Sequence, residues 1–183
     1  VDGSTYELPK PFMVLATQNS VETYGTYHLP EAQMDRFIMK VSIGYPEKEA
    51  EMDILLRNEK SVSAKMLEAV ITCEEITLLM DEIKKVYCSE AVRSYIVEIA
   101  EATRNADYIK LGVSPRGSIA LFRMAKAYAY VMGRSYVVPD DIKELAPYVL
   151  AHRMILTPKG KSVVATNEEA IDRILQTIAV PLE

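Results

Sequence analysis

The chain lacks tryptophan and has little cysteine or histidine, with two of each in 183 residues. Cys73 and Cys88 have no metal-ligand spacing and no neighbouring histidine, so neither a cysteine-bound metal site nor a disulfide framework is expected. We interpret them as two buried thiols in a reducing cytoplasm. No apolar run approaches the roughly 20 residues that a membrane helix needs, and no signal peptide opens the chain. These absences predict a cytoplasmic chain with no membrane span and no metal of its own.

An excess of positive charge is also missing, since 21 Lys and Arg face 26 Asp and Glu for a net charge of -5. This balance argues against nucleic acid as a main partner and against a helical DNA-binding bundle. What is present is an ordinary globular composition, 49% apolar and 26% charged. The chain opens with Val1-Asp2-Gly3-Ser4 rather than Met. We interpret this start as the inside of a longer protein.

Two apolar runs near the start, Phe12–Thr17 and Phe37–Ile43, have the character of buried strands. Between them, Pro30–Arg36 is typical of a short helix with proline at its first turn. Strand, helical crossover and strand together outline a parallel α/β unit. Two such strands are too few for a stable domain. We therefore expect residues 1–45 to be a small, incomplete α/β remnant.

From residue 46 onward the periodicity is helical, and residues 46–183 are predicted to form an all-helical bundle of five or six helices. Capping boxes at Thr72/Glu75 and Thr166/Glu169, and a cap at Ser89, mark three of the helix starts. Apolar stripes are expected on five helices: Ile76, Leu79, Met80, Ile83, Val86 and Tyr87; Val92, Tyr95, Ile96, Ile99, Ala100 and Thr103; Phe122, Ala125, Ala129 and Met132; Ile142, Leu145, Ala146, Val149 and Leu150; Ile171, Ile174, Leu175 and Ile178.

Arg116 occupies an unusual position for a cation. Ser114 is expected as N-cap and Pro115 as first helical residue, which places Arg116 in the first turn, against the positive end of the helix dipole. This costs about 0.3–1 kcal/mol unless an anion offsets it. A helix N-terminus with a guanidinium is suited to a phosphate, and Gly117 would let a ligand approach the backbone. The alternative is that Arg116 turns sideways to a carboxylate.

Two more residues are candidates for phosphate chemistry. Asn19 follows the first apolar run, where ligands lie in parallel sheets, and its amide could orient a water against a phosphate. Alternatively, Asn19 only holds its own turn. Arg36 ends the short helix and either pairs with Glu31 or Asp35 or is offered to the γ-phosphate of a neighbouring subunit.

Specific segments resemble a known family. Ala16–Asn19 followed by Gly25–Phe37 resembles the signature of the MoxR family of AAA+ ATPases. Gly112–Arg116 and Gly133–Ile142 are similar to the lid of that family. The resemblance implies that Asn19 is sensor 1, Arg36 the arginine finger and Arg116 sensor 2. Ser20 and His28 depart from it, since the family usually has proline at both positions.

Two family elements are not found: the Gly-rich loop carrying Lys-Ser/Thr, and an apolar strand ending in Asp-Glu. These bind the triphosphate and Mg²⁺. The chain therefore looks like a C-terminal fragment, with the end of the α/β nucleotide-binding subdomain in residues 1–45 and the lid in residues 46–183. The resemblance implies ATP with Mg²⁺ as cofactors of the full-length protein and ATP hydrolysis there, whereas the fragment alone is expected to be inactive and to bind no nucleotide.

The resemblance also implies a ring of six subunits that remodels or matures a client protein. ATP is expected between the α/β subdomain and the lid, with Arg36 acting on the neighbouring subunit. Because the family has a further strand between the two runs, we predict that Phe12–Thr17 and Phe37–Ile43 do not pair with each other. The alternative function is a non-enzymatic helical protein-interaction module whose first 45 residues form a docking arm.

Overall fold

The structure is a computed structural model that describes residues 3, 5–18, 29–59 and 68–181. Asn19 therefore lies outside the described residues. The contacts divide the chain into two compact units, one of residues 1–13 and 41–79 and the other of residues 14–40 and 80–183. Each unit is described by itself. The predicted division near residue 45 stays a prediction.

The first unit contains α2 (Lys48–Glu59) and the beginning of α3 (Cys73–Lys85), and neither helix buries a residue. The predicted capping box opens α3: Glu75 N donates to Thr72 Oγ1 at 3.1 Å, and Thr72 N donates to Glu75 Oε2 at 2.8 Å. The helix is confirmed. Within its predicted apolar stripe, Val86 is buried and Ile76 and Ile83 are half-buried, whereas Met80 is 51% exposed. No described helix is both long and apolar enough to cross a membrane.

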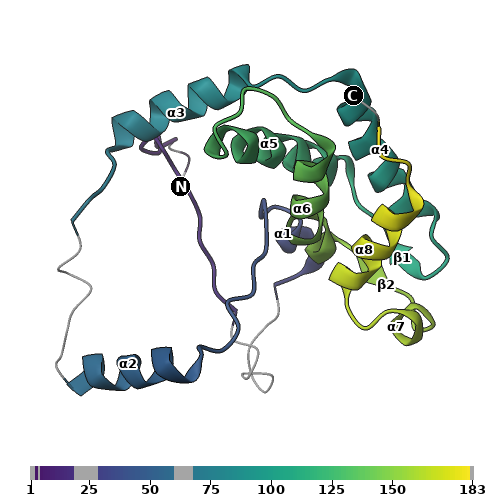
Figure 1. The fold of residues 1–183 in the computed structure, drawn as a ribbon, viewed down its shortest axis with the longest axis horizontal. Coiled ribbons are helices and arrows are strands. Elements are labelled where there is room, and N and C mark those ends of the chain that lie inside the picture. Colours follow the sequence, from purple (N-terminus) through teal and green to yellow (C-terminus); the bar gives the residue numbers. More distant parts are fainter. Residues whose placement is uncertain (1–2, 4, 19–28, 60–67, 182–183) are drawn as a thin grey trace. The chain divides into compact units, whose positions relative to one another are not determined.

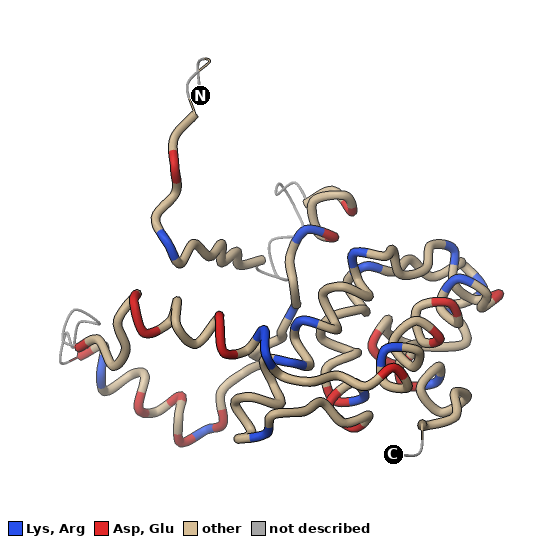
Figure 2. Tube along the Cα trace, turned by 90° about the horizontal axis from the view of Figure 1, so that it is seen from above, with Lys and Arg blue, Asp and Glu red and all other residues tan. Residues whose placement is uncertain are grey.

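The second unit is a bundle in which α4 (Glu90–Asn105), α5 (Pro115–Val131), α6 (Pro139–Leu150) and α8 (Asn167–Thr177) contact one another (Figure 1). Shorter helices are α1 (Glu31–Met34), η2 (Ala151–Arg153) and α7 (Gly160–Val163). Strand β1 (Ile109–Leu111) pairs antiparallel with β2 (Ile155–Leu156). Acidic and basic residues are interspersed along these helices (Figure 2). The mainly helical fold that was predicted is confirmed.

The core of this unit follows the predicted periodicity on α4 and α6. Ser89 Oγ accepts from Val92 N at 3.2 Å, and this cap starts α4 as expected. All six apolar-face residues predicted on α4 and all five on α6 are buried. On α5, the predicted Ala125 and Ala129 are buried, and the buried face also includes Gly117, Ala120 and Leu121, which were not predicted. Phe122 is half-buried, and Met132, at 58% exposed, was wrongly placed in the core.

Neither apolar run forms a strand in the described chain, so the strand predictions for Phe12–Thr17 and Phe37–Ile43 are wrong. The described residues contain one sheet, made of β1 and β2. The two runs are not paired with each other, in agreement with the prediction. A strand needs a hydrogen-bonded neighbour, and without one these apolar side chains stay in solvent: Leu15 is 85% and Ile43 95% exposed.

The cysteines also differ from one another. Cys88 is buried, and burial raises the pKa of its thiol. Cys73 is exposed, so the expectation of two buried thiols is wrong for this residue. The reason is the uncovered surface of α3, whose first residue is Cys73.

Candidate functional site

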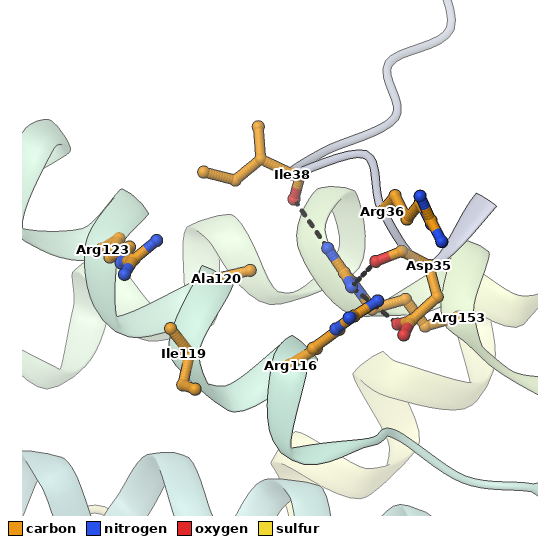
Figure 3. A pocket seen from close by; sticks show the side chains of 8 residues that line it. All are labelled: Asp35, Arg36, Ile38, Arg116, Ile119, Ala120, Arg123 and Arg153. Carbon is orange, nitrogen blue, oxygen red and sulfur yellow. Dashed lines mark hydrogen bonds and ion pairs between the residues drawn. The ribbon is translucent and has the colours of Figure 1, made fainter. Parts of the chain in front are cut away.

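Within the second unit, a cavity of about 550 Å³ brings together residues that lie far apart in the sequence. Among the described residues, its lining holds four arginines and a single carboxylate (Figure 3). The lining residues are Asp35, Arg36, Ile38, Arg116, Ile119, Ala120, Arg123 and Arg153. Two of the three residues predicted from the sequence to contact phosphate, Arg36 and Arg116, are therefore neighbours of one space. The third, Asn19, is not among the described residues.

Arg116 lies in the first turn of α5, as its sequence position predicted. Ser114 is at the N-cap with extended backbone, yet its side chain makes no capping hydrogen bond. Its Oγ instead lies 3.3 Å from Asp35 Oδ1. Arg116 is exposed, and no ion pair joins it to a carboxylate within the described residues. Arg116 thus lines the cavity from the first turn of α5, at the positive end of the helix dipole.

The one carboxylate of the lining belongs to a different pair. Arg153, with 2% of its side chain exposed, donates from Nη1 to Asp35 Oδ1 at 2.7 Å. Arg36 is exposed and forms no ion pair with Asp35 or with any other described carboxylate. The charge of Asp35 is therefore balanced by Arg153, and Arg36 and Arg116 leave the cavity with positive charge.

Sequence reasoning missed two arginines of this cavity. Arg123 follows Arg116 by seven residues on α5, so it lies on the same face about 10 Å further along the helix. This seven-residue spacing could have predicted from the sequence that Arg123 lies near Arg116. Arg153 could not be predicted as a cavity residue, because its partner Asp35 lies 118 positions away in the sequence. In Figure 3, Arg116 and Arg123 lie on either side of Ala120 and Ile119.

Gly117 has a different role from the one expected. It is buried, and a Cβ there would lie 2.4 Å from Val113 Cγ1 and 3.2 Å from Arg153 Cδ. The missing side chain therefore allows close packing of α5 against Val113 and Arg153, not the approach of a ligand. This packing brings the stem of Arg153 beside the first turn of α5.

The side chains of this cavity have the chemistry that suits an anion. Arg36, Arg116 and Arg123 present guanidinium donors that match phosphate or carboxylate oxygens in a bidentate manner. Like charges facing one space repel each other, and a multivalent anion would relieve that repulsion. The described residues contain no group of three or more His, Cys, Asp or Glu that could hold a metal ion. The lining offers a cation such as Mg²⁺ only Asp35, which Arg153 engages.

Comparisons with known proteins show which families and relatives this chain is similar to. The profile of the AAA lid domain family matches residues 101–174, and that of the ATPase family associated with various cellular activities matches residues 1–39. YeaC of Bacillus subtilis, an uncharacterised protein, is 47% identical over 183 residues, which is 100% of this chain and 57% of YeaC. The chaperone MoxR1 of Mycobacterium tuberculosis is 35% identical over 99% of this chain and 50% of its own length.

A crystal structure of a predicted ATPase from Cytophaga hutchinsonii matches the fold with a TM-score of 0.88 and 38% identity. The match covers 100% of this chain and 58% of that one. The chain thus spans about half the length of the relatives it matches. The two family matches, the relatives named MoxR and the likeness to the fold of an ATPase all indicate the same family. The chain belongs to the MoxR family of AAA+ ATPases.

Proposed function

We propose that this chain forms part of an ATP-hydrolysing MoxR protein in which Arg36 and Arg116 contact the terminal phosphate. The observation that carries the proposal is the shared cavity: two guanidiniums, 80 positions apart in the chain, face one space that contains no free described carboxylate. Arginine is worth most where charge develops on a transferring phosphoryl group. Arg36 serves as arginine finger and Arg116 as sensor 2.

The shared cavity supports a further conclusion about which subunit these arginines serve. Because Arg36 and Arg116 line one cavity of the same chain, we propose that both reach one and the same phosphate. If Arg36 is offered to the nucleotide of a neighbouring subunit, Arg116 is offered to it as well. A ring, six-membered in this proposal, supplies that neighbour. Asn19, as sensor 1, would act in the subunit that holds the nucleotide and would align the attacking water there.

ATP with Mg²⁺ fits this site only in part. The guanidiniums suit the phosphate oxygens, whereas Mg²⁺ requires several oxygen ligands, and the described lining offers only the carboxylate of Asp35, which pairs with Arg153. When bound, Mg²⁺-ATP supplies the γ-phosphoryl group and the charge neutralisation between its phosphates. We therefore propose that the nucleotide is gripped by residues outside this sequence, and that this chain alone neither binds nor hydrolyses ATP. Isothermal calorimetry of this chain with Mg²⁺-ATP should show no tight binding.

The output of hydrolysis is proposed to be a movement of the lid that remodels or matures a client protein. Loss of the γ-phosphate removes the anion that Arg116 contacts, so the helix carrying Arg116 is released. The name of the relative MoxR1, a chaperone, supports this direction. Capture experiments with the full-length protein would identify the client.

The test is turnover of ATP by the full-length protein carrying Arg36→Ala or Arg116→Ala. An arginine on a transferring phosphate contributes about 10³–10⁵-fold in some ATPases and GTPases, and we expect a loss of at least 100-fold for each variant. Arg173→Ala is the matched control, because Arg173 pairs with Glu169 on the surface of α8. Unchanged turnover in Arg116→Ala would favour the protein-interaction module instead.

A further inference from the structure

We propose that Asp35 is a positioning residue that, together with Arg153, fixes Arg36 beside Arg116. The inference rests on the proposed function, since it concerns the geometry of the same two arginines. Asp35 immediately precedes Arg36 and is the C-cap of α1. Its side chain is the point where three elements meet: α1, the N-terminus of α5 and η2.

The first contact of Asp35 is with α5. Ser114 Oγ lies 3.3 Å from Asp35 Oδ1 and 3.4 Å from Oδ2. Ser114 is the N-cap residue, two positions before Arg116. A serine at this place usually accepts from the backbone of its own helix, but here its hydroxyl is oriented to Asp35 and makes no cap bond. The segment carrying Arg36 is thus held against the turn that carries Arg116.

The second contact is with Arg153, whose guanidinium contacts the chain on both sides of Arg36. Nη1 donates to Asp35 O at 2.6 Å as well as to the carboxylate, and Nη2 donates to Phe37 O at 2.5 Å. Nε donates to Val149 O at 2.8 Å, which anchors the guanidinium to α6. A lysine could not do this, because its three donors share one nitrogen.

These bonds bracket Arg36 without involving its own guanidinium. Residues 35 and 37 are tied to Arg153, and Lys40 N donates to Tyr148 O at 2.9 Å, so the chain from 35 to 40 follows α6 and η2. Arg36 therefore moves with the helical bundle of the second unit and keeps its position relative to Arg116.

We call Asp35 and Arg153 the latch. Its function is to present both guanidiniums to one phosphate as a unit, without contacting that phosphate.

The kinetic test compares Asp35→Ala in two backgrounds of the full-length protein. In the otherwise unchanged protein, we expect kcat for ATP to fall about 10–100-fold with little change in KM, since displacing a catalytic group by about 1 Å costs on this order. In the Arg36→Ala/Arg116→Ala background, the same substitution should lower the residual kcat less than about twofold. Asp35→Asn, which keeps an acceptor oxygen, should recover part of the loss. An equal loss in both backgrounds would overturn the proposal, as would unchanged kcat in the first.

A distance measurement tests the latch independently of activity. Nitroxide labels at Gln33→Cys on α1 and Glu144→Cys on α6, with Cys73→Ser, report how α1 is held on the bundle. The distance distribution should be narrow, should broaden with Asp35→Ala and Arg153→Met, and should be unchanged with Arg173→Met. A distribution that stays narrow without Arg153 would overturn the latch. If Arg36→Ala/Arg116→Ala retained full turnover, the proposed function would fail, and these distances alone would decide whether the latch exists.

Discussion

The ion pair between Arg134 and Asp141 should be a main stabilising contact of the bundle. Asp141, with 3% of its side chain exposed, accepts from Arg134 Nη1 at 2.9 Å, from Arg134 Nη2 at 2.5 Å and from Val138 N at 2.9 Å. Arg134→Met leaves this buried carboxylate with only its backbone partner. Breaking a fully buried pair costs about 3–5 kcal/mol. The side chain of Arg134 is 26% exposed, so water can reach the site and solvate part of the carboxylate when the arginine is removed. We therefore expect Arg134→Met to lower the free energy of unfolding by about 2–4 kcal/mol.

Urea unfolding followed by circular dichroism measures this free energy, and two further variants locate its source. Asp141→Asn keeps an acceptor for Val138 N and should cost less than Arg134→Met, about 1–2 kcal/mol. Lys143→Met breaks the exposed pair with Asp140 at 2.9 Å on the same helix, and should cost under about 1 kcal/mol. Equal losses for Arg134→Met and Lys143→Met would refute the reasoning that burial sets the size of the effect.

Three further changes probe other parts of the second unit. Burial lowers the pKa of His152 below its ordinary value of 6.5, and its Nε2 lies 3.2 Å from Phe37 O. As the pH falls below 6.5, the imidazole of His152 is therefore protonated in the unfolded chain before it is protonated in the folded chain. The free energy of unfolding should drop from pH 7.5 to pH 5.5, and it should drop more steeply than in His152→Gln. Denaturant titrations at the two pH values measure this difference. Arg123→Ala should lower ATP turnover of the full-length protein about tenfold, through loss of one charged hydrogen bond; steady-state kinetics with no change would remove Arg123 from the site. Gly112→Ala places a Cβ 2.8 Å from the Arg104 backbone, and should lower stability by about 1–3 kcal/mol in the same urea assay.

Much of the helical bundle was predictable from local sequence. At the helix starts of Ser89 and Thr72, the side-chain hydroxyl accepts from the backbone N–H three residues later, and the structure shows both hydrogen bonds. The buried faces of α4 and α6 follow the 3.6-residue period because each helix has one face on the core. The position of Arg116 in the first turn of α5 follows from Ser114 and Pro115 in the same way.

Other features depend on partners distant in the chain and could not be predicted from the sequence. Phe12–Thr17 has the pattern of a buried strand, but a strand exists only where another strand pairs with it, and the described chain provides none. Periodicity placed Phe122 in the core, and it packs against the core only partly buried. Gly117 was not predicted on the buried face of α5, and it lies there because α6 and Arg153 approach closely. The pairing of Asp35 with Arg153 has no local signal, and it determines which arginines remain for an anion.

Mixing experiments test most directly whether Arg36 and Arg116 serve the same nucleotide. Full-length Arg36→Ala and Arg116→Ala subunits, each inactive alone, are combined in equal amounts, and ATP turnover is measured after reassembly. If both arginines are offered to the same neighbour, every interface lacks one of them, and the mixture should stay inactive. A mixture of Arg36→Ala with Asn19→Ala should regain activity, because some interfaces then carry both arginines and the amide. Recovery of turnover in the Arg36→Ala and Arg116→Ala mixture would contradict the shared site.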